Sequence, residues 1–496
     1  MEIAQLSKTD YIKGLQCSKS LWFFKNRKDL KLSVDKKLES KFEFGNEINE
    51  LARKYFSNGV KADDNYFDIK KAVLSTQELI SRNHNIIFEA TAQSNNFSHA
   101  RIDILQKSKN EDGWDLIEVK GSTSAKPSHL NDLSFQLSVF TEAGYKINSC
   151  ILMLLNKEYI FNNNLDIEKL FKFEDVTSDV FELQSSTKLI KDNLKKILKE
   201  KSEPAVKIGA HCFEKKDHHY ECDFKYHCFQ NIPQYSAFDI YQKKKAEQIS
   251  KEIDSYEISD IPSKLLPKGL KKVDVDCYLN DKTHFDKAKL NEFLSNLEYP
   301  LYFLDYETFQ LPVPIFNISR PYQQIPFQFS LHIQYKPNSE LKHFEFLHQN
   351  NSDPREDFIQ NLIKTCDNKG SIIVYHQSFE ETRNKELARD FPQYSNQILS
   401  LNSRLVDLEI PFKNKYIYSP KQQSSSSIKK VLPAFTDLNY QDLEIKSGGD
   451  AMNIYANFIK GETLLEGNLI KDLLEYCKRD TYAMVMLLNQ LLELNE

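Results

Sequence analysis

The sequence predicts an α/β protein with two domains, and three observations support this prediction. Hydrophobic residues make up 40% of the 496 positions and charged residues 28%, which is enough apolar surface for packed cores. At roughly 100–200 residues per domain, this length allows two to four domains. Strand-like apolar runs and amphipathic helix patterns occur together in two blocks, 1–240 and 296–496, which a charged, lysine-rich connector at 241–295 joins.

Composition excludes several classes of protein. Glycine is scarce, with 13 residues, and neither G-x-G-x-x-G nor G-x-x-x-x-G-K-[ST] occurs, so no common phosphate-binding loop is present. The net charge of −5 excludes a globally basic nucleic-acid-binding protein, and any such contact must come from local patches or bound cations. No apolar run approaches the roughly 18 residues of a membrane span, and the N-terminus lacks a signal-peptide pattern. We therefore expect a cytoplasmic protein without a membrane partner.

Hydrophobic periodicity locates the elements of each block. In the first block we expect helices at 36–55, 68–82 and 132–143, strands at 85–91, 99–106, 114–119 and 150–155, and a lysine-rich helix at 187–201. In the second block we expect strands at 301–305, 327–335 and 371–375, and helices at 355–366, 379–390 and 467–494.

Acidic side chains and one lysine fall on consecutive predicted strands of the first block. Residues two apart on a strand point to the same face, so Glu118 and Lys120 are expected to face one site. Asp103 on the neighbouring strand would meet Glu118 there, and Glu89 would supply a further carboxylate. Carboxylates suit Mg²⁺ or Mn²⁺, and a lysine beside them can orient the attacking water and stabilise charge on a phosphate. The alternative is unrelated surface charge at strand ends.

The arrangement Asp103…Glu118-Val119-Lys120…Gln136 resembles the RecB-type branch of the PD-(D/E)xK nucleases, specifically the CRISPR-adaptation exonucleases and helicase-associated nucleases that carry an iron–sulfur cluster. The resemblance implies a restriction-endonuclease-like mixed sheet, with Asp103 and Glu118 as metal ligands, Lys120 as the water-orienting cation and Gln136 as a substrate or site contact. The sequence departs from the family at Phe140, where tyrosine is usual, and at 44–50, which lacks the histidine that the family often has on an early helix.

Four of the eight cysteines form a second candidate site. Thiolates suit zinc or an iron–sulfur cluster, but structural zinc usually uses two close Cys-x₂₋₄-Cys pairs. Here nine and five residues separate the last three of the four, and the first is remote. One N-terminal and three C-terminal cysteines resemble the ligand pattern of the same nucleases, which implies a 4Fe–4S cluster that joins the two ends of the domain. Zinc and free thiols are the alternatives. The four are Cys17, Cys212, Cys222 and Cys228.

A third group of candidate residues lies in the second block. Asp305 and Glu307 are two apart on an apolar strand and therefore share a face. Tyr476 and Asp480 are four apart on a predicted helix and also share a face. Paired carboxylates are what a two-metal phosphoryl-transfer site requires, and a tyrosine hydroxyl can position the attacking water.

Together with Glu380, these residues resemble the DnaQ-type exonucleases of the RNase H-like fold, in the subclass that has tyrosine in place of histidine. The resemblance implies a 3′–5′ exonuclease in which Asp305, Glu307, Glu380 and Asp480 bind metal ions. The family has aspartate where this chain has Glu380. The order of the two parts is similar to an uncharacterised bacterial family of fused nucleases.

The sequence thus predicts a metal-dependent DNA nuclease with two hydrolytic centres. The resemblance favours single-stranded DNA, and RNA stays possible. Lysines of the basic helix would contact phosphates or form a solvated face: 188, 191, 195, 196, 199 and 201. The alternatives are a DNA-end-binding or scaffolding protein with one or both centres degenerate, or an RNA exonuclease.

Overall fold

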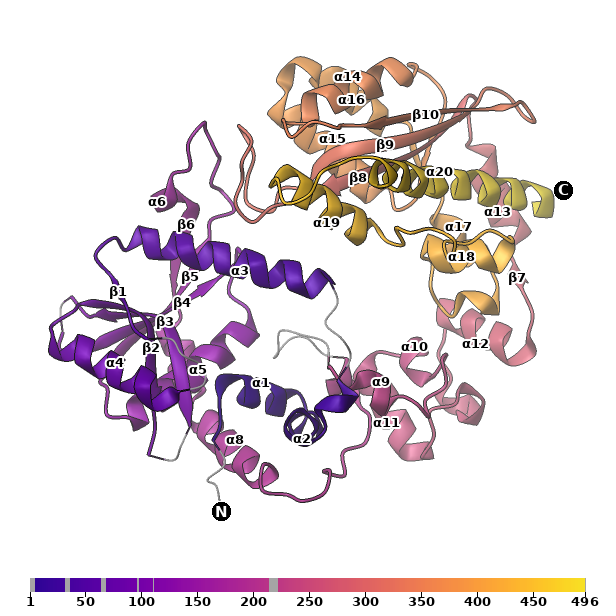
Figure 1. The fold of residues 1–496 in the computed structure, drawn as a ribbon. Coiled ribbons are helices and arrows are strands. Elements are labelled where there is room, and N and C mark those ends of the chain that lie inside the picture. Colours follow the sequence, from indigo (N-terminus) through magenta and orange to yellow (C-terminus); the bar gives the residue numbers. More distant parts are fainter. Residues whose placement is uncertain are drawn as a thin grey trace. The chain divides into compact units, whose positions relative to one another are not determined.

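The computed structural model describes residues 5–31, 36–63, 68–95, 98–109, 111–213 and 222–495, with the backbone alone for 36–43. The chain forms two compact units (Figure 1). The first comprises Met1–Ile232 and Pro312–Pro321, and the second comprises Pro233–Leu311 and Tyr322–Glu496. Each unit contains a mixed sheet with helices, which confirms the predicted α/β class.

The sheet of the first unit has six strands in the order β1-β2-β3-β4-β5-β6. The pairs β1–β2 and β4–β5 are parallel, and the other neighbours are antiparallel. Four of these strands confirm those predicted from the apolar runs, with slightly longer bounds. The strands are Val60–Lys61 (β1), Ile86–Gln93 (β2), His99–Lys107 (β3), Trp114–Lys120 (β4), Ile147–Leu155 (β5) and Phe171–Asp175 (β6).

Helix α5 organises the core of this unit, because it packs on β2, β3 and β5 and in turn carries α1 and α8. It starts earlier than predicted, with Pro127 in the first turn, where a missing N–H costs nothing. Lys191 of α8 is buried, and its ammonium pairs with Glu142 at 2.7 Å, so this lysine supports the core and does not offer a phosphate contact. The helices are Lys8–Gln16 (α1), Ser18–Asn26 (α2), Lys36–Tyr55 (α3), Ile69–Ser81 (α4), Pro127–Glu142 (α5), Ile167–Leu170 (α6), Thr177–Glu182 (α7), Gln184–Ile197 (α8) and Lys225–Cys228 (α9).

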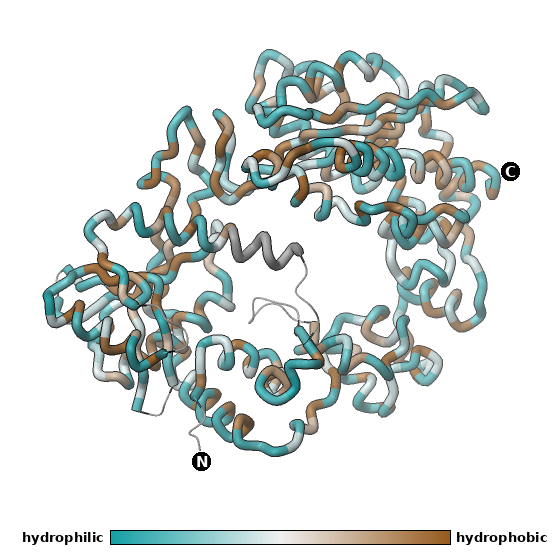
Figure 2. The backbone as a smooth tube through the Cα atoms, in the orientation of Figure 1, coloured by the Kyte–Doolittle hydropathy of each residue, from teal (hydrophilic) through white to brown (hydrophobic). Residues whose placement is uncertain are grey.

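The main sheet of the second unit has five strands in the order β10-β9-β8-β11-β12. The first three are antiparallel, and β11 and β12 continue parallel to β8. Hydrophobic and polar residues both occur along these strands (Figure 2), and β8 and β9 are nevertheless almost entirely buried. The strands are His284–Phe285 (β7), Leu301–Phe309 (β8), Ile325–Gln334 (β9), Leu341–Leu347 (β10), Ile372–Val374 (β11), Leu405–Asp407 (β12) and Ile417–Tyr418 (β13).

Residues 241–295 belong to the second unit and are mostly helical. Strand β7 of this segment pairs with β13. The buried Asp274 forms an ion pair with Lys415 at 2.7 Å. The helices of the unit are Ala237–Ile240 (α10), Lys243–Ile253 (α11), Leu270–Asn280 (α12), Lys287–Ser295 (α13), Arg355–Thr365 (α14), Ser378–Asp390 (α15), Ser395–Asn402 (α16), Ile410–Lys413 (α17), Ile428–Phe435 (α18), Gly448–Ile459 (α19) and Asn468–Asn495 (α20). Within the described ranges, no helix has the length and apolar character needed to cross a membrane.

Two histidines lie opposite each other on β9 and β10 and should make the stability of the second unit pH-dependent. The rings of His332 and His343 lie 4.5 Å apart, and burial lowers the pKa of each to about 4. In the unfolded chain the pKa of a histidine is near 6.5, so between about pH 6.5 and about pH 4 the unfolded state binds more protons than the folded state. The stability that these histidines contribute is therefore full above about pH 6.5 and falls as the pH drops toward 4. We expect His343→Gln to lose less stability than the wild type between about pH 7 and about pH 5 in urea melts. Equal losses in the two proteins would contradict this prediction.

Candidate active sites

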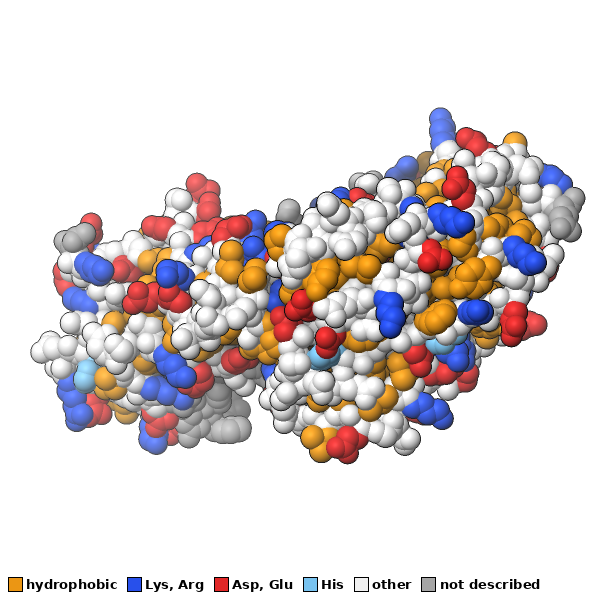
Figure 3. Space-filling view, turned by 90° about the horizontal axis from the view of Figure 1, so that it is seen from above, with side chains coloured by type: hydrophobic (Ala, Val, Ile, Leu, Met, Phe, Trp, Pro, Cys, Tyr) orange, Lys and Arg blue, Asp and Glu red, His pale blue; other side chains and the backbone are white. Residues whose placement is uncertain are grey.

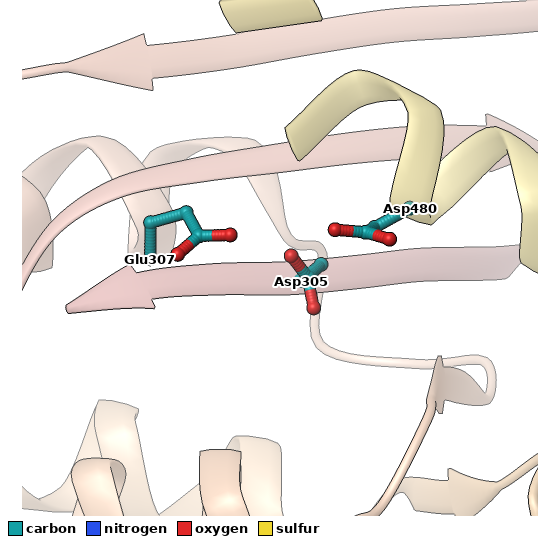
Figure 4. Close-up of side chains that lie close together, drawn as sticks. All are labelled: Asp305, Glu307 and Asp480. Atoms are coloured by element: carbon teal, nitrogen blue, oxygen red, sulfur yellow. The ribbon is translucent and has the colours of Figure 1, made fainter. Parts of the chain in front are cut away.

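Three carboxylates of the second unit converge on one point. Among the described residues, Asp305, Glu307 and Asp480 are the group of potential metal ligands whose oxygens lie within 4.8 Å of one another. Figure 4 shows that two come from β8 and one from α20, and that their carboxylates point toward one another. The structure thus brings together residues that are more than 170 positions apart in the chain.

The alternation of β8 explains why two of these acids share a face. Tyr302, Leu304 and Tyr306 point into the hydrophobic core beneath the sheet. The residues between them therefore point to the opposite face, where α19 and α20 contact the strand. The predicted strand placed Asp305 and Glu307 on one face, and the structure agrees.

The carboxylates of this cluster form no close ion pair with a described basic side chain, and Lys429 acts on them only from beyond ion-pair distance. In the part of the chain that the structure describes, no Lys, Arg or His nitrogen lies within 4.0 Å of Asp305, Glu307, Glu380 or Asp480. Burial, and then the neighbouring carboxylates, raise the pKa of Asp305 and Glu307 well above the ordinary range. Burial raises the pKa of Asp480 to about 6, although a hydrogen bond from Tyr440 and the charge of Lys429 oppose the shift. The three acids therefore repel one another and are suited to a divalent cation.

Glu380 lies at the edge of the cluster, in the first turn of α15. The side chain is 1% exposed, and its Oε2 atom makes no hydrogen bond with any described residue. Burial, and then the charge of Asp305, raise the pKa of this carboxyl well above its ordinary value. Glu380 lies outside the group within 4.8 Å, but its charge also acts on Glu307, so this buried oxygen is a candidate fourth metal ligand.

Two tyrosines flank Asp480. Tyr476, one turn earlier on α20, is 4% exposed, and burial raises the pKa of its hydroxyl well above the ordinary value. The Tyr440 hydroxyl donates a hydrogen bond to Asp480 Oδ1 at 2.6 Å. Tyr440 lies between α18 and α19, and no sequence pattern pointed to it, because the contact depends on how this connection folds over α20.

Two further residues of this site, Lys429 and Gly448, were not predicted from the sequence. Lys429 of α18 places its ammonium over the rings of both tyrosines. Gly448 begins α19, and a Cβ atom there would lie 3.4 Å from Glu307 Oε2. The glycine therefore allows the positive end of the α19 dipole to approach a carboxylate closely. A Gly-Gly pair before a helical pattern is the one signal that could have indicated this.

In the first unit, Asp103 and Glu118 meet where the β3–β4 ladder ends. The last paired residues are Ile104 and Ile117. Beyond them, the Val119 N–H donates to Asp103 Oδ2 at 2.8 Å, so the aspartate side chain takes the place of the missing backbone acceptor. The two predicted carboxylates therefore lie on adjacent, separating strands.

Lys120 and Gln136 both contact the predicted site. The Lys120 ammonium lies 3.0 Å from Glu118 Oε1 and 2.6 Å from Asp132 Oδ2. The Gln136 amide donates to Glu118 Oε2 at 2.8 Å. Lys8, at the start of α1, also pairs with Glu118 at 2.9 Å, and no sequence pattern indicated this contact. The structure thus gathers the predicted residues around Glu118 and adds Lys8 and Asp132.

Glu89 lies across from Asp103 but faces a cation of its own. Its carboxylate pairs with Arg53 at 3.1 Å. Its φ of 56° is left-handed, and the β2–β3 ladder skips the Glu89–Asp103 pair while it records Phe88–Ile104 and Ala90–Ile102. A left-handed non-glycine residue in a strand stores strain, which is typical of functional positions.

The two sites differ in charge balance. In the first unit, Lys120 and Lys8 outweigh burial and hold the pKa of Glu118 at about 2. Burial and the charge of Glu118 raise the pKa of Asp103 to about 8. Lysines therefore compensate the first site internally, whereas no lysine or arginine of the described residues forms an ion pair with the acids of the second.

The four predicted cysteines line one small cavity of about 20 Å³. The first starts the turn between α1 and α2, and the other three follow from the segment after α8. Burial raises the pKa of Cys212 to about 12 and also raises the pKa of Cys17 and Cys228. The other cysteines, Cys150, Cys277, Cys366 and Cys477, are buried elsewhere.

Part of this chain is similar to known proteins. Residues 302–427 match a family model described as a domain of unknown function, DUF2779. An uncharacterized protein of Mycoplasma pneumoniae, the MG366 homolog, is 31% identical over 217 residues, which cover 38% of this chain and 31% of the relative. The uncharacterized protein MG366 of Mycoplasma genitalium is 28% identical over 204 residues, 37% of this chain and 30% of its own. The chain thus matches about a third of the length of these relatives. No solved structure matches the chain.

Proposed function

We propose that this chain is a metal-dependent nuclease with two hydrolytic centres that cuts phosphodiester bonds, with single-stranded DNA as the favoured substrate. The observation that carries the proposal is the cluster of Asp305, Glu307 and Asp480, whose oxygens lie within 4.8 Å of one another and form no ion pair with a basic side chain in the described part of the chain. Its residues also resemble the DnaQ-type motif set, and an RNase H-like fold for the second unit belongs to the same proposal.

The residues of the second centre fit Mg²⁺ or Mn²⁺, because the donors are carboxylate oxygens and the buried Glu380 Oε2 lacks a partner. Asp305, Glu307, Asp480 and Glu380 would hold the ions, which supply Lewis-acid stabilisation of the phosphate and activation of water. The Tyr476 hydroxyl, fixed beside Asp480, positions the attacking water. Tyr440 holds Asp480 Oδ1 by its hydrogen bond, so this carboxylate keeps its orientation. The expected products are nucleotides released from a 3′ end.

The first centre would have a restriction-endonuclease-like fold, with Asp103 and Glu118 as the ion-binding pair and Glu89 as a further carboxylate. Gln136 orients Glu118 by donating to its second oxygen. Lys120 is held between Glu118 and Asp132, so its charge is fixed where a scissile phosphate would accumulate negative charge.

The four cysteines line one cavity, although among the described residues no three of their sulfurs lie within 4.8 Å of one another. We propose that they bind a 4Fe–4S cluster, with zinc as the alternative. Four thiols from the two ends of the first unit line the same cavity. Metal binding would stabilise the thiolate form of each cysteine, so the thiols would lose their protons despite the raised pKa values. The cluster would hold α1 and α2 against the segment that follows α8.

The surface limits how the substrate is attracted. Figure 3 shows acidic and basic side chains interspersed on the visible face, in keeping with the net charge of −5. Attraction for a polyanion must therefore come from bound cations and from individual lysines near each centre, and binding should weaken steeply with salt.

The test is digestion of single-stranded DNA that is labelled at either end, with Mn²⁺ or EDTA. We expect the wild type to digest the strand only with the metal ion. Asp305→Asn should abolish shortening from the 3′ end, and Asp103→Asn, which keeps an oxygen for the Val119 N–H, should abolish the remaining cleavage. An RNA strand of the same sequence distinguishes the RNA exonuclease. Equal, metal-independent digestion by the wild type and the double variant would refute the proposal.

One observation favours a second candidate function for the first unit alone. The Glu118 carboxylate already pairs with two lysines, Lys8 and Lys120, so it is neutralised without a metal ion. This arrangement suits a degenerate centre that binds DNA ends without cutting them. Binding of labelled DNA by the Asp305→Asn protein with no cleavage at any metal concentration would support that function.

A further inference from the structure

Lys429 reaches the second centre from an element outside the acidic motifs. It lies in the first turn of α18, which packs against α20. Its ammonium is 5.3 Å from the centroid of the Tyr476 ring and 5.4 Å from that of Tyr440. Both contacts are within the range of a cation–π interaction. The lysine therefore has a defined position beside the hydroxyl group that would place the attacking water.

The charge of Lys429 acts on the acidic cluster, but the lysine forms no ion pair with its carboxylates. Lys429 lowers the pKa of Asp305, Glu307 and Asp480, which places it within electrostatic reach of all three. None of these carboxylates lies within 4.0 Å of the ammonium. Its hydrogen bond goes to the Lys446 carbonyl oxygen. Since an ammonium has three N–H donors, two remain for a ligand.

A cation in this position would help the acidic cluster to hold a nucleic-acid strand. A nucleic-acid strand brings phosphates toward a group of carboxylates, and like charges repel even when bound ions offset part of the charge. A half-buried lysine with two available donors supplies a charge-assisted contact to a phosphate oxygen. The neighbouring Lys430 is exposed and donates to Gln423 Oε1 at 2.9 Å, away from the two tyrosine rings.

We infer that Lys429 is a substrate-binding residue of the second centre that contacts a backbone phosphate at the 3′ end of the nucleic-acid strand. This inference rests on the proposed nuclease function. Lys429 would supply the positive group that holds this backbone phosphate, which the acidic motifs alone do not supply. A phosphate bound equally in the ground and transition states affects KM rather than kcat.

Lys429→Gln tests the inference, because glutamine keeps a donor for the Lys446 carbonyl and loses the charge. We expect KM for a single-stranded oligonucleotide to rise about tenfold, with kcat changed less than about twofold. The slope of log KM against log salt concentration should fall by about 0.7, the value for one phosphate contact on a single strand. Lys429→Arg should restore KM to within about twofold, and Lys430→Gln is the matched control with unchanged KM.

A second measurement keeps the inference independent of turnover. In the Asp305→Asn background, Lys429→Gln should weaken binding of a fluorescent oligonucleotide about tenfold by anisotropy, with the same reduced salt slope. Unchanged affinity and slope, or an equal loss in Lys430→Gln, would overturn the role of Lys429 while wild-type digestion still upheld the nuclease proposal. A wild type that binds through Lys429 but digests nothing would overturn the nuclease proposal and leave the binding site standing.

Discussion

Asp305→Asn is expected to make the metal-free protein more stable and, at the same time, to reduce 3′-end digestion by at least about a hundredfold. Asp305 shares a buried cluster with Glu307 and Asp480, and no basic side chain pairs with it among the described residues. Removing one charge relieves this repulsion, so the melting temperature in EDTA should rise. The same change removes an oxygen that a divalent cation would need.

Metal addition separates relief of repulsion from other causes of stabilisation. Mn²⁺ at about 100 times its dissociation constant should stabilise the wild type by about 2.7 kcal/mol, because it binds only the folded state. The Asp305→Asn protein should respond far less. Glu381→Gln is a matched control, since Glu381 pairs with Lys385 on the outer side of α15. If Asp305→Asn melts lower in EDTA, or if Mn²⁺ stabilises it as much as the wild type, the carboxylate cluster is not a metal site.

Cys212→Ser is expected to abolish the visible absorbance of anaerobically purified protein and to destabilise the first unit. Cys17 and Cys212 line the same cavity although about two hundred residues separate them. A group bound to both closes that long loop, and the entropy of closure alone is worth about 5 kcal/mol. The wild type should absorb near ~400 nm, as expected for iron–sulfur ligation, and contain iron and sulfide. Thermal melts should show the loss of stability.

The control for this prediction is Cys150→Ala, which removes a buried thiol of β5 in the same unit but outside the cavity. It should cost about 1 kcal/mol of packing and leave the absorbance unchanged. Zinc without iron in the wild type would replace the cluster by the zinc alternative. Neither metal in the wild type, with equal melting of wild type and Cys212→Ser, would overturn the metal site altogether.

Local periodicity carried much of the architecture. Alternating and continuous apolar runs predicted β2, β3, β4, β5 and β8. Each of these strands faces a core on at least one side, and that side carries apolar residues. The same period placed Asp305 and Glu307 on one face. Strand β12 has three residues and helices α16 and α18 have eight each, which is too few periods to stand out from the neighbouring sequence. The longer strand β10 and helix α19 were not predicted either.

By itself, the amino-acid sequence determined the α/β class, the strands that carry the acids and the spacing of the cysteines. Tertiary structure alone decided that Tyr440 donates to Asp480, that Lys429 lies over two tyrosine rings, that Lys8 pairs with Glu118 and that Lys191 is buried. A strand or helix repeats its pattern over neighbouring residues, so its inward face can be predicted locally. Contacts between residues 40 or 110 positions apart depend on how separate elements pack, and no local pattern encodes that packing.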